Sequence, residues 1–235
     1  MTVAKLSSAL SAVDWNNNVQ VFLKDTKSAE IVADVSMKLA VWARQLETVD
    51  HENPSISFIR EMQISSQQVA ALTALALYKT AAGAMRSMFE NALYYTYFRT
   101  HLSELETLVR DPAYFVDKRQ LIEYHKTHTV RFTELQSKLG LITRLNTWYS
   151  KVSAIVHGQI PGKWTEHKTL SDIKHIEATR ALVVEVFREG GDLVHCLFLC
   201  TVGQNFWDVF STPSKKMLLA GLSGDLKKAL MLDIA

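Results

Sequence analysis

The sequence predicts an all-α helical bundle, and three observations lead to that fold class. Apolar residues recur every three or four positions through most of the 235 residues, which is the period of a helix buried along one face. Glycine and proline are scarce, with nine and four residues, so few turns are available for a loop-rich or all-β fold. Alternation of apolar and polar residues, which is typical of strands, never continues beyond a few positions.

Two helical segments are expected before the first clear break. Residues 3–24 show a helical pattern that is interrupted near Asn16-Asn17-Asn18. Ser28 is placed to cap a second helix that continues to Val49, because a serine hydroxyl accepts a hydrogen bond from a free amide at a helix start. The run Asp50-His51-Glu52-Asn53-Pro54 then ends the helical pattern.

The segment 65–99 is the centre of the predicted bundle. It has no proline and a single glycine, Gly83, so we expect one long helix. Lys79, Arg86 and Glu90 interrupt its apolar run, and each charge would be costly in a bilayer, so we expect no membrane span. A helix that is apolar nearly all round is buried nearly all round. Arg86 and Glu90 should therefore lie inside the bundle or line a cleft.

Further helices are expected in the second half of the chain. Asp111-Pro112 predicts a helix start, since aspartate caps a helix and proline suits its first position. A short helical pattern over 130–139 stops at Gly140. Residues 141–157 form a compact amphipathic pattern, and Gly158 follows its last residue as a helix-ending glycine should.

The last long helix follows a loop over residues 159–168. Thr169 or Ser171 is expected to cap this helix, which continues towards Phe206 with a kink at Gly190-Gly191. The chain is expected to form a single helical domain, 1–235, made of N-terminal helices (1–60), a core (61–205) and a C-terminal helical tail (206–235).

Charge and cysteine content limit the classes of function. The net charge of +2 indicates no general polyanion-binding surface, although local clusters remain open. Cys196 and Cys200 are a turn apart on one helix, which is poor geometry for a disulfide, so we expect buried reduced thiols rather than a metal site with His195. The first residues lack a long apolar core and a cleavage site, so we expect no signal peptide and a cytoplasmic location.

The helix end at His157 is the most site-like part of the sequence. Tyr149, Ser153 and His157 recur every four residues, so they share a helix face that drifts by about 40° per step. In the last turn, the helix dipole favours a protonated imidazole, which suits holding an anion or donating a proton. The alternative is a structural histidine that bonds the last carbonyls of its own helix.

Two motifs carry a family resemblance. Arg86-Ser87-Met88-Phe89-Glu90, together with the later segment Tyr149-Ser150-Lys151-Val152-Ser153-Ala154-Ile155-Val156-His157-Gly158, resembles the HEPN superfamily. The resemblance covers roughly residues 65–205 and is to branches with an Arg-Ser-x-x-Glu helix and a Ser-x-x-x-His-Gly helix end. It implies an all-helical HEPN-like core behind extra N-terminal helices, and a homodimer. It also implies an RNA-cleaving toxin or phage-defence effector, with an antitoxin or another defence protein as partner.

The chain departs from the nuclease motif of that superfamily, which is an arginine followed four to six residues later by a histidine. His157 matches the histidine, but the basic residue at that distance is Lys151, and Arg144 lies too far upstream. An ammonium lacks the bidentate fork of a guanidinium. Lys151 also lies about 120° from His157 around an ideal helix. We therefore infer that Arg86 supplies the missing guanidinium.

The expected catalytic residues are His157, Arg86, Glu90, Ser153 and Tyr149. In a nuclease, an RNA 2′-hydroxyl would attack the neighbouring phosphodiester while His157 moves a proton. Arg86 or Lys151 would stabilise the negative charge that develops on the phosphate. No Asp/Glu cluster has metal-ligand spacing, so we expect neither a metal ion nor another cofactor.

Weaker signals leave room for RNA contacts elsewhere. His125, His128 and Arg131 form a basic patch that could join Lys151 in binding a phosphate backbone, or could be an ordinary solvated helix face. Three tyrosines could stack bases or belong to the core: Tyr94, Tyr95 and Tyr97. Two functions therefore stay open, a metal-independent endoribonuclease and a non-catalytic HEPN-like module that binds a nucleotide, nucleic acid or partner protein.

Overall fold

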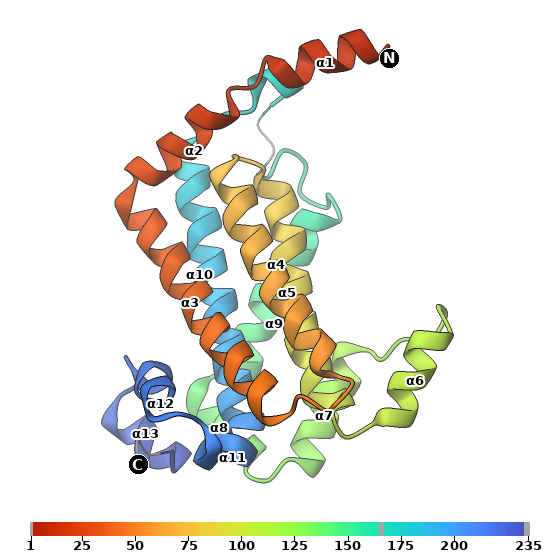
Figure 1. The fold of residues 1–235 in the computed structure, drawn as a ribbon, viewed down its shortest axis with the longest axis vertical. Coiled ribbons are helices and arrows are strands. Elements are labelled where there is room, and N and C mark those ends of the chain that lie inside the picture. Colours follow the sequence, from red (N-terminus) through yellow and green to blue (C-terminus); the bar gives the residue numbers. More distant parts are fainter. Residues whose placement is uncertain (1, 165–166, 233–235) are drawn as a thin grey trace.

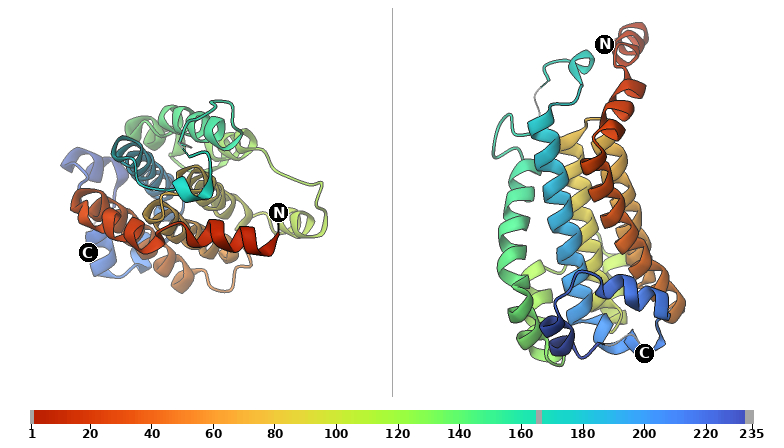
Figure 2. Two further views of the ribbon diagram at one scale, coloured as in Figure 1. Left: turned by 90° about the horizontal axis from the view of Figure 1, so that it is seen from above. Right: turned by 90° about the vertical axis from the view of Figure 1, so that its left-hand side faces the viewer.

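Five long helices lie side by side in the computed structural model, which describes residues 2–164 and 167–232 (Figure 1). They are α3 (Thr26–Val49), α4 (Ile56–Ala74), α5 (Tyr78–Phe98), α9 (Leu141–Val156) and α10 (Glu177–Cys200). Figure 2 shows α10 between α3 and α9. The described residues contain no strand, and the expected all-α bundle is confirmed.

Shorter elements extend and cover this bundle. They are α1 (Val3–Ser11), α2 (Trp15–Lys24), α6 (Leu102–Arg110), α7 (Lys118–His128), α8 (Phe132–Leu139), α11 (Val202–Phe206), α12 (Thr212–Leu219), α13 (Gly224–Leu230) and the 3-10 turns η1 (Leu170–Asp172) and η2 (Trp207–Val209). Helix α1 has no buried residue and projects from one end of the bundle (Figure 1). Within the described ranges, no helix has both the length and the apolarity that a membrane crossing needs.

The expectation of one helix over 65–99 is wrong. The chain breaks at residues 75–77, and α4 and α5 pack against each other as a hairpin (Figure 1). Ala76 takes a left-handed backbone conformation with φ 61°, and the Leu77 amide donates to the Leu72 carbonyl. A left-handed alanine costs roughly 1–2 kcal/mol. Folding the apolar run back on itself buries surface along two helices, which more than offsets that cost.

Helix starts were the least accurate expectations. The first break falls at residues 12–14, before the asparagines. Helix α3 begins at Thr26, and its cap is Asp25, whose side chain accepts a hydrogen bond from the amide of Ser28. Asp111 starts no helix, because its carboxylate accepts the amide of Ala113 in a local turn.

Two further helix starts differ from expectation, whereas two helix ends agree with it. Helix α7 begins only at Lys118. Thr169 caps the short turn η1, so α10 starts later, at Glu177, without a side-chain cap. The ends at Gly140 and Gly158 are confirmed, since both glycines are left-handed, with φ 61° and 68°. Of the predicted loop 159–168, residues 165–166 lie outside the described residues.

Helix α10 is the best-buried element and continues uninterrupted through Gly190-Gly191, where we expected a kink. These glycines allow close packing instead. A Cβ at Gly190 would lie 2.6 Å from Cζ2 of Trp148, and one at Gly191 would lie 2.4 Å from Cγ1 of Val35. Both cysteines of α10 are buried free thiols, as expected.

Candidate functional site

Arg86 and His157 meet in space although 71 positions separate them in the sequence. Helix α5 presents Arg86 near its middle, and α9 presents His157 at its C-cap. Nη1 of Arg86 lies 2.9 Å from Nε2 of His157. A guanidinium can only donate, so this contact needs Nε2 as acceptor and the imidazole proton on Nδ1. The expected proximity of Arg86 to this helix end is therefore observed.

Glu90 and Tyr149 fix the orientation of Arg86. Nε of Arg86 donates to Oε1 of Glu90 over 2.8 Å, and the Tyr149 hydroxyl donates to the same oxygen over 2.5 Å. Burial and the bond to Glu90 raise the pKa of Tyr149 to about 12, so the phenol is a donor at neutral pH. Burial opposes the charge on Arg86, but its contacts with Glu90 outweigh this and raise the Arg86 pKa. The guanidinium is thus both charged and held in place.

Ser153 is less directly placed than the other four expected residues. It lies on α9, one turn before His157. Its Oγ is buried and has no hydrogen-bond partner among the described residues. Its carbonyl accepts the backbone amide of His157 over 2.9 Å, but its hydroxyl bonds neither Arg86 nor His157. A catalytic role for the Ser153 hydroxyl therefore stays a prediction.

A pocket of about 470 Å³ opens beside Arg86, between α5, α9 and the start of α7. This volume is within the range of small-molecule sites, about 300–1,000 Å³. The charged and aromatic side chains that line it are Arg86, Lys118, Arg119, Glu90, Asp117, Tyr94, Phe115 and Tyr149. We call this hollow the Arg86 pocket.

Lys118 is the pocket residue with the most unusual surroundings. Its Nζ lies 4.5 Å from the ring centroid of Tyr149, a cation–π distance, and donates to Oδ1 of Asn146 over 3.0 Å. Burial lowers the Lys118 pKa. Sequence reasoning missed Lys118, Arg119 and Phe115, because it treated residues 112–124 as one helix. The consecutive cations after Asp117, a good capping residue, were the available signal.

The expected nucleic-acid contacts are not gathered in one place. His125 is 2% exposed and bonds Oγ1 of Thr96 and Oγ1 of Thr129 over 2.9 and 2.8 Å. Burial lowers its pKa to about 4, so it is neutral at pH 7. The expectation of a surface patch that includes His125 is therefore wrong. It turns inward from α7, where the sequence pattern placed it beside exposed charges.

The other three expected contacts lie apart from one another. His128 is exposed in the last turn of α7. Arg131 binds the Glu134 carboxylate and donates to the carbonyl of Ala229. Lys151 is exposed on α9, and its charge acts on Glu185 of α10. None of the three lines the Arg86 pocket.

The candidate base-stacking tyrosines divide into two groups. Tyr95 and Tyr97 are buried. The hydroxyl of Tyr95 donates to Asp50 and that of Tyr97 donates to Glu104, so both have structural partners. Tyr94 is half-buried and lines the Arg86 pocket. Only Tyr94 of the three is therefore available to a ligand there.

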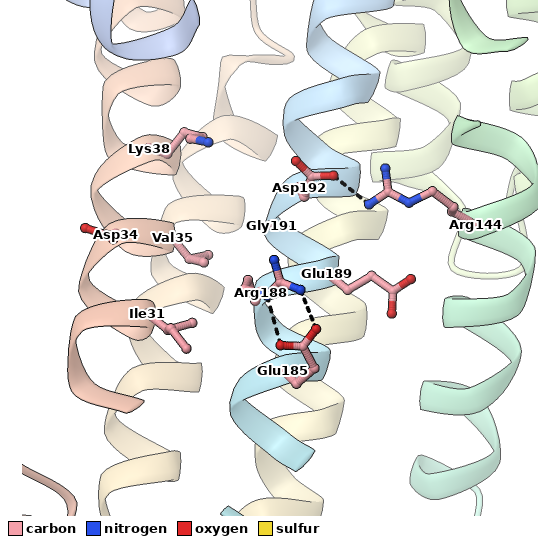
Figure 3. Close-up of a pocket in the computed structure, with 10 residues that line it drawn as sticks. All are labelled: Ile31, Asp34, Val35, Lys38, Arg144, Glu185, Arg188, Glu189, Gly191 and Asp192. Atoms are coloured by element: carbon pink, nitrogen blue, oxygen red, sulfur yellow. Dashed lines mark hydrogen bonds and ion pairs between the residues drawn. The ribbon is translucent and has the colours of Figure 1, made fainter. Parts of the chain in front are cut away.

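A second hollow, of about 510 Å³, lies between α3, α10 and α9 (Figure 3). Carboxylates outnumber cations in its lining, and two of the cations bind carboxylates within the hollow. Arg144 pairs with Asp192, and Arg188 pairs with Glu185. The charged lining residues are Lys38, Arg144 and Arg188 against Asp34, Glu185, Glu189 and Asp192. The Arg86 pocket, with three cations and two carboxylates, is the better place for an anion.

Comparison with family models, curated proteins and solved structures finds no match for this chain. Among the residues that the structure describes, no three His, Cys, Asp or Glu side chains are grouped so that they could hold a metal ion. Fold and site together define an all-α bundle with a composite Arg–His site beside a cationic, aromatic pocket.

Proposed function

We propose that this protein is a HEPN-like endoribonuclease that cleaves RNA at Arg86 and His157 without a metal ion. The observation that supports the proposal most is the 2.9 Å contact between the guanidinium of Arg86 and Nε2 of His157. In this proposal, the guanidinium is the cation that holds the phosphate, and Nε2 is the base that accepts the proton of the hydroxyl. Arg86 takes the place of the motif arginine that the sequence lacks near His157.

The chemistry follows from the two side chains. A phosphate that binds Arg86 replaces its contact with His157 and leaves Nε2 free to accept a proton. Nε2 removes the proton of the RNA 2′-hydroxyl, the 2′-oxygen forms a bond to phosphorus, and the bond to the 5′-oxygen breaks. The protonated imidazole then gives its proton to the 5′-oxygen. The products are a 2′,3′-cyclic phosphate and a 5′-hydroxyl.

Glu90 and Tyr149 are positioning residues in this scheme. Glu90 binds Nε of Arg86, and Tyr149 donates to Glu90. An edge of the guanidinium then remains for the phosphate, whose negative charge it stabilises as the pentacoordinate transition state forms. Because the donor is already oriented, little reorganisation is needed at the moment of reaction.

The wider role rests on the resemblance to the HEPN superfamily. We propose a cytoplasmic homodimer that acts as a toxin or a phage-defence effector and is controlled by an antitoxin or another defence protein. Burial of both free cysteines is compatible with a reducing compartment.

A second candidate function is a non-catalytic module that binds a nucleotide. Two observations favour it over cleavage. Lys151, the basic residue at the motif distance, acts on Glu185 rather than lining the Arg86 pocket. That pocket joins cations and aromatic rings beside Arg86 and does not include His157. Binding there needs no proton transfer.

Cleavage of total RNA and of purified tRNA in the presence of EDTA tests the proposal. The wild type should cut, and His157→Ala should not. A matched control is His51→Ala, which removes another exposed histidine, in the turn that follows α3. A histidine at a helix end contributes at most ~2 kcal/mol through the dipole, so melting curves should show both variants folded. A wild type that cuts neither RNA, yet binds a nucleotide with or without the His157 side chain, would leave only the binding module.

A further inference from the structure

We infer that the Arg86 pocket binds one unpaired nucleotide, with its phosphate at Lys118 and Arg86 and its base on Phe115. This inference rests on the proposed function, because it treats the pocket as the part of the RNA site next to His157. It adds a ligand-binding role for the start of α7 and for the segment before it.

The phosphate position follows from two converging cations. Nζ of Lys118 and Cζ of Arg86 lie 4.5 and 5.2 Å from the same Tyr149 ring, so both cations approach one aromatic side chain. Arg86 already has an ion-pair partner in Glu90. Lys118 has no ion pair among the described residues, and its ammonium donates a hydrogen bond to the neutral amide of Asn146. A half-buried ammonium without a carboxylate partner gains most from an anionic ligand.

The start of α7 adds to this preference for an anion. Lys118 is the first residue of the helix, where free amides and the dipole favour negative charge. Asp117 adds a negative charge to the pocket lining, but its carboxylate is held as the helix cap by the amide of Arg119 over 2.6 Å. Arg119 follows as a third, exposed cation. The pocket therefore keeps an excess of positive charge.

The base position follows from Phe115. This residue is 71% exposed, and it is the one exposed aromatic residue among the described Phe, Tyr and Trp. It lies in the segment between α6 and α7, outside the hydrophobic core, and lines the pocket with half-buried Tyr94. An exposed ring beside cations is the arrangement on which single-stranded nucleic acids stack their bases.

The pocket favours an unpaired nucleotide over a base pair. A duplex keeps its bases stacked on one another, whereas a single strand can turn one base onto a protein ring. Arg86 belongs both to the pocket and to the contact with His157, so a nucleotide held here brings its phosphate next to the imidazole. Free nucleotides and single-stranded RNA share the required chemistry, and the experiment separates them.

Fluorescence anisotropy on the full chain tests the inference without turnover when His157→Ala is the background. The probes are a short labelled single-stranded oligoribonucleotide, the same strand in a duplex, and unlabelled adenosine monophosphate as competitor. Phe115→Ala should weaken single-strand binding about 5- to 150-fold, since one stacked base contributes ~1–3 kcal/mol. Phe115→Tyr should retain binding, and neither change should alter binding of the duplex.

Lys118→Met should weaken binding of the single strand and reduce its salt dependence by about one phosphate contact. Lys216→Met, which removes an exposed lysine from α12, is the matched control and should change nothing. Competition by the monophosphate identifies a pocket that also takes free nucleotides. A lack of competition restricts the ligand to a nucleotide within a strand.

Unchanged affinity in both Phe115→Ala and Lys118→Met would overturn the inference, as would an equal loss for duplex and single strand. These results are separable from failure of the proposed function. If the wild type cleaves RNA while the two variants bind normally, the inference about the pocket fails and the proposed function stands. If the wild type never cleaves RNA while both variants lose affinity for single-stranded RNA, the proposed enzyme activity fails and a nucleotide-binding module remains.

Discussion

Replacing Glu90 by Gln removes one charge from the site while keeping the shape of the side chain. Glu90 binds Nε of Arg86 over 2.8 Å and accepts the Tyr149 hydroxyl, and the Arg86 and Glu90 side chains are 27% and 33% exposed. Two unit charges at that distance attract by about 6 kcal/mol at an effective dielectric constant of about 20. Desolvation and screening cancel most of this, so we expect a net contribution of about 1–2 kcal/mol, between exposed and buried pairs.

The kinetic constants of RNA cleavage should separate positioning from simple charge. If Glu90 orients Arg86, Glu90→Gln should lower kcat about five- to thirtyfold, which is the rate equivalent of 1–2 kcal/mol. KM should not rise, because the site gains net positive charge and attracts RNA more strongly.

Glu104→Gln is the matched control for this variant. Glu104 also accepts two tyrosine hydroxyls, from Tyr97 and Tyr114, but it lies outside the Arg86 pocket. The Glu104→Gln variant should therefore leave the kcat of RNA cleavage unchanged. A Glu90→Gln protein that binds RNA more tightly and turns over at the wild-type rate would show that Glu90 does not position Arg86.

Stability measurements test the packing of the helical bundle. In urea unfolding, Gly191→Ala should lower the free energy of unfolding by about 1–3 kcal/mol, because its Cβ would lie 2.4 Å from Val35. Gly83→Ala, whose Cβ would meet nothing within 4 Å, should raise the free energy of unfolding by up to about 1 kcal/mol. Ala76→Gly should raise the melting temperature, because φ 61° suits glycine; a lower value would contradict the break between α4 and α5. Burial lowers the pKa of His125 from 6.5 to about 4, so stability that is present above pH 6.5 should fall towards pH 4, and His125→Gln should flatten that decline.

Local sequence signals predicted the α9 end of the site well. The helix period over 141–157 and the left-handed glycines Gly140 and Gly158 depend on neighbouring residues alone, and the structure matches both. The placement of Arg86 near His157 followed from a burial argument, because a charged pair in an apolar helix needs a polar destination.

Tertiary packing decided the features that the sequence did not reveal. Ala76 carries no turn signal, so only the burial gained by the α4–α5 hairpin explains the break there. His125 follows the buried residues Leu121 and Ile122 on α7, yet neighbouring charges suggested a solvated face. The Arg86 pocket escaped prediction because Lys118 and Arg86 line one pocket only once α7 packs against α5.

A double-mutant cycle on RNA cleavage tests whether Arg86 and His157 act as one unit. The kcat/KM values of wild type, Arg86→Gln, His157→Ala and the double variant are compared with EDTA present. Groups that serve the same step lose their effect together, so the double variant should be no slower than the slower single variant. Losses that multiply would show that the 2.9 Å contact has no catalytic meaning.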